Sequence, residues 1–174
     1  MNKIVIIGGG LAGCEAAYQI SKFDINVDLY EMRPKVKTEA HQTKYLAELV
    51  CSNSFRSDDK EYNAVGVLHE ELRIADSLIM KCADNNKVPA GSALAVDRDN
   101  FAKEVNKTIK SIPSINIINK EVNGDCERII SIMQTIDISK RNKEYLLFDT
   151  ALTYLTYQSL SSSHEEVAIA PIHN

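Results

Sequence analysis

Two short stretches contain residues whose types and spacing could do chemistry. The first is the glycine-rich run GGGLAG, in which Gly8, Gly10 and Gly13 form the pattern G-x-G-x-x-G. Glycines at this spacing let the backbone approach a phosphate closely, because no Cβ stands in the way. The second stretch is ELVCSNSFRS, where Cys51 stands between an apolar run and a polar segment. The question for that thiol is whether it takes part in chemistry or simply fills space.

The glycine pattern stands between elements that suit a nucleotide site. The β-branched run KIVIIG, residues 3–8, predicts a buried strand, and residues 11–23 predict a helix with alanines along one face. A second strand, Val27 to Glu31, ends in an acidic residue 18 positions after Gly13. A strand, a glycine turn, a helix and a second strand that ends in a carboxylate together form the fingerprint of dinucleotide binding.

Each part of this fingerprint has a physical reason. Gly8 allows the tight turn, Gly10 lets a pyrophosphate reach the helix N-terminus, and Gly13 allows the helix to pack closely on the strand. Glu31 can accept hydrogen bonds from a ribose hydroxyl. The pattern alone leaves FAD and NAD open, and the alternative interpretation is a glycine-rich turn followed by a surface glutamate.

The next part of the chain predicts an irregular region followed by one long helix. Residues 35–62 are mostly polar, with a short helix expected around residues 44–50. Apolar residues at spacings of three and four then predict a single amphipathic helix, with His69, Glu70, Glu71 and Arg73 outside its apolar stripe. The stripe consists of Val65, Leu68, Leu72, Ala75 and Ile79.

A second helix and a third strand complete the predicted elements of this region. VPAGSALAV predicts a turn that leads into a short extended piece. Asp97 or Asp99 can cap the helix that follows, whose apolar residues recur from Phe101 to Ile112 and which Pro113 ends. Residues 115–118 predict a strand.

Composition and charge narrow the class of protein. The 174 residues are 44% hydrophobic and 25% charged, as expected for a soluble globular domain with a core. The net charge of −4 provides no global attraction to nucleic acid or anionic membrane. No apolar run is long enough to span a bilayer, and the N-terminus lacks a signal-peptide layout.

The four cysteines indicate reduced thiols in a cytoplasmic protein. They form no CxxC pair and lie far apart, which argues against a zinc or other metal site. Cys14 and Cys82 lie in predicted helices and are expected to be small core residues. Cys126 has no assigned role.

The character of the chain changes after about Val122, since six of the seven glycines precede that point. Residues 1–122 are expected to form the dinucleotide-binding region. Residues 123–174 are expected to form a tail with one helix, at about residues 140–160, and a loose polar end. The predicted fold class is α/β: an incomplete Rossmann-type domain with a parallel sheet and a helical C-terminal tail.

Six segments resemble one protein family in their order and spacing. They are IGGGLAGCEAA, LYEMRP, ELVCSNSFRS, NAVGVLHEELR, DSLIMKCAD and VPAGSALAVDRDNF. Over residues 1–122 the chain resembles the folate- and FAD-dependent tRNA (uracil-5-)-methyltransferase family, TrmFO. It is less similar to the family that modifies the wobble uridine of tRNA. The resemblance implies FAD at the glycine loop and, if the activity is retained, methylenetetrahydrofolate, NAD(P)H and a tRNA T-loop uracil.

The resemblance also matches Cys51 to a catalytic cysteine of that family. A thiolate that adds at C6 makes C5 of uracil nucleophilic. Members of the family are considerably longer, and their inserted substrate domain and second catalytic cysteine have no match here. Residues 139–155 resemble the family's last helix, which implies that a middle part has been deleted.

We therefore expect a truncated FAD-binding chain that is inactive in isolation, with Cys51 as an inherited, idle cysteine. The alternatives are an active enzyme completed by a second polypeptide and a non-catalytic nucleotide-binding module. Arg33 could contact a phosphate or the adenine side of FAD, or could be solvated. Arg56 could lower the pKa of the Cys51 thiol or contact phosphate, or could be solvated.

Overall fold

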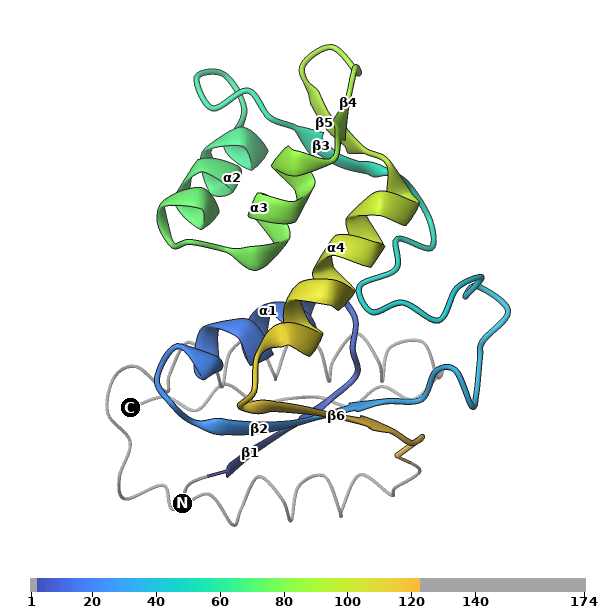
Figure 1. The fold of residues 1–174 in the computed structure, drawn as a ribbon. Coiled ribbons are helices and arrows are strands. Elements are labelled where there is room, and N and C mark those ends of the chain that lie inside the picture. Colours follow the sequence, from blue (N-terminus) through green and yellow to red (C-terminus); the bar gives the residue numbers. More distant parts are fainter. Residues whose placement is uncertain (1–2, 123–174) are drawn as a thin grey trace, which may run out of the picture. The chain divides into compact units, whose positions relative to one another are not determined.

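The computed structural model describes residues 3–122, and Figure 1 shows how their helices and strands are arranged. The chain divides into two compact units, Met1–Asn123 and Gly124–Asn174. The helix and the loose end predicted for the tail lie outside the described residues. Within residues 3–122, no helix is long and apolar enough to cross a membrane.

A parallel sheet of three strands forms the base of the first unit (Figure 1). β1 (Lys3–Ile7) pairs with β2 (Asn26–Glu31), and β2 pairs on its other side with β6 (Ile115–Asn119). The order β1-β2-β6 corresponds to one half of a Rossmann fold. The three strands predicted at residues 3–8, 27–31 and 115–118 are all confirmed, and they belong to the same sheet.

Helices α1 (Leu11–Ser21) and α4 (Arg98–Ser111) pack on this sheet and against each other. Their buried side chains include Cys14, Ala17, Ile20, Phe101, Val105 and Ile109. Asp97 caps α4, as predicted, because its carboxylate accepts a hydrogen bond from the Asn100 amide at 3.0 Å. The apolar side chains of these two helices therefore cover one face of the sheet.

A small antiparallel sheet lies in the crossover between β2 and β6. β3 (Ser54–Ser57) pairs with β5 (Ala93–Val96), and β5 pairs with β4 (Lys87–Val88). The extended piece predicted in VPAGSALAV is β5. Sequence reasoning missed β3, which has four residues and one large apolar side chain, Phe55. That ring packs edge-on against Phe101 of α4, with the ring centroids 5.6 Å apart.

The short helix predicted around residues 44–50 is wrong, since turns and bends occupy this stretch. Ala47 has a positive φ of 52°, and its amide donates to the Gly9 carbonyl at 2.8 Å instead of to a neighbour in a helix. The Glu48 carboxylate accepts from the Gln42 and Thr43 amides at 2.9 and 3.0 Å. The Ala47 amide thus has a partner outside the segment, and the Glu48 side chain satisfies the two amides before it, so no helix is needed to satisfy these groups.

The chain forms two helices, α2 (Ala64–Ile74) and α3 (Leu78–Asn85), where one was predicted. Asp76, with a φ of 54°, lies in the break, and Ser77 is the N-cap residue of α3. Glu15 of α1 accepts from the Ser77 hydroxyl at 2.8 Å and from two amides in the first turn of α3 at 2.9 and 3.3 Å. A carboxylate from another helix therefore completes this cap, which hydrophobic spacing cannot reveal.

The predicted apolar stripe of α2 is also wrong about which face is buried. Leu68 is 51% exposed, whereas Gly66 and His69 are buried. A Cβ on Gly66 would overlap the backbone at Asp59, so the glycine lets α2 lie close to that turn. His69 Nδ1 lies 3.0 Å from Asp58 Oδ1. Arg73 and Lys87 also donate hydrogen bonds to the Asp58 carboxylate. Polar contacts of His69 and Arg73 with Asp58 therefore occupy the inner face of α2, where the apolar stripe was expected.

Candidate functional site

The glycine loop connects β1 to the N-terminus of α1, as predicted. Gly8 has a φ of 99°, in the left-handed region that favours glycine, and its amide donates to the Tyr30 carbonyl at 2.8 Å. A Cβ on Gly13 would overlap the Gly8 carbonyl oxygen, so glycine is needed for α1 to approach the turn. A Cβ on Gly10 would meet no atom of residues 3–122 within 4 Å. The space beside Gly10 is therefore open to a ligand.

The start of α1 is suited to an anion. Gly10 is its N-cap residue and provides no side-chain hydrogen bond, and the first turn contains no acidic residue. The amides of the first turn carry the positive end of the helix dipole and need acceptors. A phosphate or pyrophosphate beside Gly10 could accept hydrogen bonds from them.

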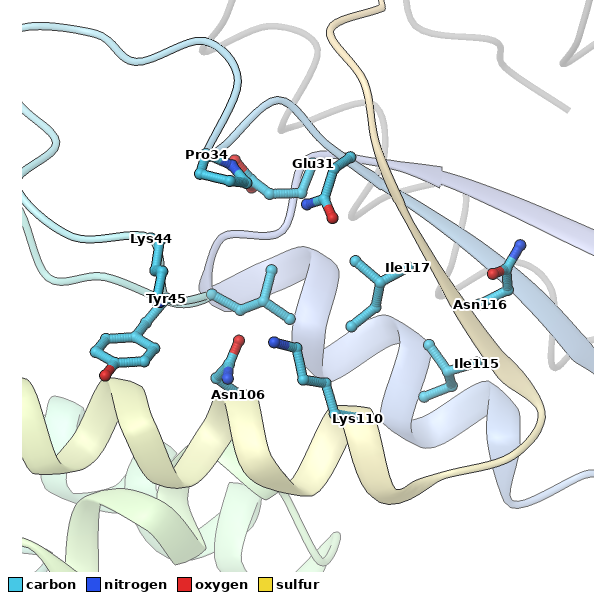
Figure 2. A pocket seen from close by; sticks show the side chains of 11 residues that line it. Glu31, Pro34, Lys44, Tyr45, Asn106, Lys110, Ile115, Asn116 and Ile117 are labelled. Carbon is cyan, nitrogen blue, oxygen red and sulfur yellow. The ribbon is translucent and has the colours of Figure 1, made fainter.

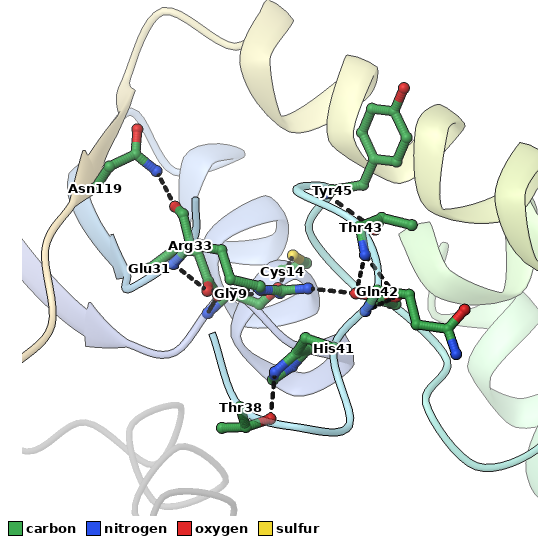
Figure 3. A network of polar contacts seen from close by, with 11 residues as sticks. Gly9, Cys14, Glu31, Arg33, Thr38, His41, Gln42, Thr43, Tyr45 and Asn119 are labelled. Carbon is green, nitrogen blue, oxygen red and sulfur yellow. Dashed lines mark hydrogen bonds and ion pairs between the residues drawn. The ribbon is translucent and has the colours of Figure 1, made fainter. Parts of the chain in front are cut away.

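Glu31 lies at the carboxyl end of β2 beside the glycine loop, where the fingerprint places it (Figure 3). Its buried carboxylate accepts from the Gly9 amide at 2.9 Å, and from the Arg33 amide and Nε at 2.9 and 2.8 Å. Burial alone would raise the pKa of Glu31, but Arg33 and the Gly9 amide hold it below its usual range. The ribose contact of Glu31 stays a prediction.

Arg33 is 2% exposed, so the solvated alternative for this residue is wrong. Its guanidinium bridges two carboxylates: Nη2 lies 3.2 Å from Glu31 Oε2, and Nη1 lies 3.0 Å from Glu48 Oε2. Burial would lower the pKa of Arg33, but the two carboxylates raise it above its ordinary value. Contact of Arg33 with a phosphate or with adenine stays a prediction.

A cavity of about 450 Å³ opens beside Glu31, between α4, the loop at residues 44–46 and strand β6 (Figure 2). This volume lies in the range of small-molecule sites, about 300–1,000 Å³. Its polar lining includes Lys44, Tyr45, Asn106 and Lys110. Sequence reasoning did not identify this cavity. The available signal was the spacing of four between Asn106 and Lys110, which puts both side chains on one face of a helix.

Cys51 is exposed and therefore does not fill space in the core. The backbone around it is held at two places. Arg98 Nη2 donates to the Cys51 carbonyl at 3.2 Å. Asn53 and Val96 exchange two hydrogen bonds, at 2.9 and 3.1 Å. Arg56 is also exposed, and its effect on the thiol stays a prediction.

Alkylation should separate the three described cysteines. Cys14 and Cys82 are buried, as predicted, and burial raises the pKa of each to about 12. Because the thiolate is the reacting form, we expect iodoacetamide at about pH 8 to modify Cys51 well before the other two. Peptide mass spectrometry over a time course measures the three rates, with a urea-unfolded sample as the control. Equal rates in the folded protein would contradict the buried positions of Cys14 and Cys82.

Comparison with known proteins places this site in a family. Residues 3–149 match the sequence family described as glucose inhibited division protein A. The chain is 65% identical over 121 residues to the methylenetetrahydrofolate–tRNA-(uracil-5-)-methyltransferase TrmFO of Bartonella henselae, and 56% identical over 124 residues to that of Brucella anthropi. These alignments cover 70% and 71% of this chain but 26% of each relative. The chain thus spans about a quarter of the length of these relatives.

A solved structure supports the fold. GidA of Aquifex aeolicus matches with a TM-score of 0.54 and 16% identity, over 69% of this chain and 20% of that chain. This likeness concerns the fold alone, and it agrees with a partial Rossmann-type domain. The predicted resemblance to TrmFO is confirmed by the identities of the two relatives. Because the family match covers more than half of its residues, the chain belongs to the glucose inhibited division protein A family.

Proposed function

We propose that this chain binds FAD as a TrmFO-like protein, and that the glycine loop holds the pyrophosphate. The observation that carries the proposal is the open space at Gly10, in front of the uncapped N-terminus of α1 and beside Glu31. Amides and a helix dipole directed at one open space form an anion site. FAD is the dinucleotide implied by the resemblance to TrmFO.

Two further features would hold the adenosine half of FAD. The ribose hydroxyls would donate to Glu31, whose low pKa keeps it ionised and able to accept them. The adenine ring would enter the neighbouring cavity, where Tyr45 offers an aromatic face and Asn106 offers an amide. When bound, FAD supplies the redox chemistry of one-carbon transfer.

We further propose that the isolated chain does not methylate tRNA. The TrmFO relatives are about four times longer than the aligned segment, which covers 26% of each of them. Binding of methylenetetrahydrofolate, NAD(P)H and tRNA would need residues that this chain does not match. Cys51 would then be an idle thiol of a cytoplasmic protein. On this proposal the chain would act as a non-catalytic nucleotide-binding module.

The edge of the parallel sheet favours a second candidate function, an enzyme completed by another polypeptide. Among the described strands, β1 pairs with β2 alone, so one of its edges has no described partner. Val5 and Ile7 of β1 are 40% and 45% exposed. The backbone of an unpaired edge can accept a strand from another chain, and the exposed side chains of Val5 and Ile7 add apolar surface on the adjoining face of the sheet. Co-expression with the missing part of a relative, followed by co-purification, would test this candidate.

Flavin titration tests the proposed function. Glu31→Ala should weaken FAD binding by about 1–2 kcal/mol, the scale of a lost charged hydrogen bond to a ribose. Glu31→Gln keeps the shape of the side chain and should weaken binding in the same direction. The control is Glu70→Gln on α2, because Glu70 pairs with the exposed Lys60 at 2.8 Å and does not line the cavity beside Glu31.

Binding is followed by flavin fluorescence, and the fold of each variant by circular dichroism. Parental affinity in both Glu31 variants would exclude the ribose contact. A parent protein that retains no flavin after removal of excess FAD would overturn the proposed function.

A further inference from the structure

Residues 42–51, which we call the Cys51 segment, lie against the glycine loop. Leu46 and Ala47 are 2% and 0% exposed. The Ala47 amide donates to the Gly9 carbonyl at 2.8 Å, and a Cβ on Gly9 would lie 2.5 Å from Leu46 Cδ2. The peptide that would face a bound pyrophosphate thus also contacts the segment that ends in Cys51.

Arg33 makes a second contact with the Cys51 segment (Figure 3). Its Nη1 donates to Glu48 Oε2 at 3.0 Å. Glu48 in turn organises its own segment, because its carboxylate accepts the Gln42 and Thr43 amides at 2.9 and 3.0 Å. Hydrogen bonds and the Arg33 charge hold the pKa of Glu48 below its usual range despite partial burial, so the bridge joins charged groups.

The other end of the bridge, Glu31, has no spare acceptor position in this structure. A carboxylate offers about four acceptor positions. Four donors approach that of Glu31: the Gly9 amide and the Arg33 amide, Nε and Nη2. A ribose hydroxyl can therefore bind Glu31 only by sharing an acceptor position with one of these donors, three of which belong to Arg33. A ligand on Glu31 acts directly on Arg33.

We propose that Arg33 is a positioning residue, which joins Glu31 to Glu48 so that a dinucleotide bound at the glycine loop fixes the position of Cys51. The role of the ligand rests on the proposed function, whereas the bridge itself is present without ligand. A ligand over Glu31 excludes water from the bridge, and charged hydrogen bonds strengthen when water is excluded. The Cys51 segment is then held more tightly, and its thiol reacts more slowly.

The first arm of the experiment measures alkylation of Cys51 by iodoacetamide without ligand, by peptide mass spectrometry. Glu48→Gln keeps the shape of the side chain but removes the charge. We expect the rate at Cys51 to rise by at most about tenfold, the factor of one lost charged hydrogen bond, because the thiol is already exposed. Arg33→Lys keeps the charge but cannot span both carboxylates, and should raise the rate as well. A parental rate in both variants would overturn the positioning role.

The matched control is Glu70→Gln, which removes the exposed pair between Glu70 of α2 and Lys60 in the turn before it, 2.8 Å apart. Glu70 also lies 3.9 Å from Arg73 Nη1, but neither pair touches the Cys51 segment, and exposed pairs contribute little, so this change should leave the rate at Cys51 unaltered. Melting curves confirm that each variant is folded. An equal acceleration in Glu70→Gln and Glu48→Gln would show general loosening and overturn the proposal.

The second arm repeats the measurement with each protein saturated with FAD. We expect the parent to react about fivefold more slowly with FAD, in the lower range of measured couplings between sites, and Glu48→Gln to show no such slowing. Equal slowing in the variant would mean that FAD shields the thiol directly, which overturns the coupling. If the parent binds no flavin, the proposed function and the coupling both fail, while the ligand-free rates still decide the positioning role.

Discussion

Gly10→Val is expected to abolish flavin binding while leaving the protein folded. A Cβ at this position meets no atom of residues 3–122 within 4 Å, and the backbone, with φ −77° and ψ −167°, is extended and open to any residue. The added methyl groups would instead occupy the space proposed for the pyrophosphate. Flavin absorbance of the purified variant after incubation with FAD measures the loss, and circular dichroism shows whether the fold is retained.

The neighbouring glycine of the same pattern provides the contrast. Gly13→Ala introduces a Cβ that overlaps the Gly8 carbonyl oxygen, and the backbone of the turn cannot move aside as a side chain would. We expect it to lower the free energy of unfolding by about 3 kcal/mol, at the upper end of ordinary overpacking. Urea denaturation thus separates a glycine required for the fold from one required for the ligand. Full flavin occupancy in Gly10→Val would contradict the pyrophosphate assignment.

No transfer of a methyl group to tRNA is expected from the isolated chain, even with FAD, methylenetetrahydrofolate and a nicotinamide reductant present. The described site offers a dinucleotide half-site and one exposed thiol, Cys51. It offers no excess of positive charge for an RNA backbone, since residues 1–122 contain 16 Lys and Arg against 17 Asp and Glu, and the tail adds 4 against 7. Release of tritium from C5-labelled uracil in T-loop RNA measures the reaction.

The Cys51→Ala variant makes this result interpretable. Equal background from parent and variant is the expected outcome, and it would leave Cys51 as an inherited thiol. Release by the parent that disappears in the variant would make Cys51 a working catalytic residue and the chain an enzyme. A full-length TrmFO relative provides the positive control for the assay.

The elements that were predicted correctly depend on local signals. The strands beginning at Lys3 and Ile115 are short runs rich in β-branched residues, and the strand beginning at Asn26 ends in an acidic residue at the spacing that the glycine pattern predicts. Asp97 caps a helix through an amide three residues away. Gly8 and Gly13 are required by their own turn. Such features are encoded within a few residues, so spacing and residue type suffice to predict them.

The features that sequence reasoning missed depend on partners far along the chain. The burial of Arg33 requires Glu48, and the start of α3 requires Glu15, 62 positions before Ser77. His69 of α2 is buried because it contacts Asp58, so the hydrophobic spacing predicted the wrong buried face of this helix. Each case is a polar contact between residues far apart in the sequence. The spacing of apolar residues predicts only which apolar side chains are buried, so it cannot reveal such contacts.

The position of β6 beside β2 has a consequence for the order of folding. Asp28 and Asn116, which bond across these strands, are 88 positions apart, whereas Gly9 and Glu31 are 22 apart. For a flexible chain, two doublings of the loop length add about 1 kcal/mol to the entropy cost of closure. The β1–α1–β2 unit can therefore form from local contacts, while docking of β6 becomes affordable once the intervening helices and small sheet have already drawn its ends together.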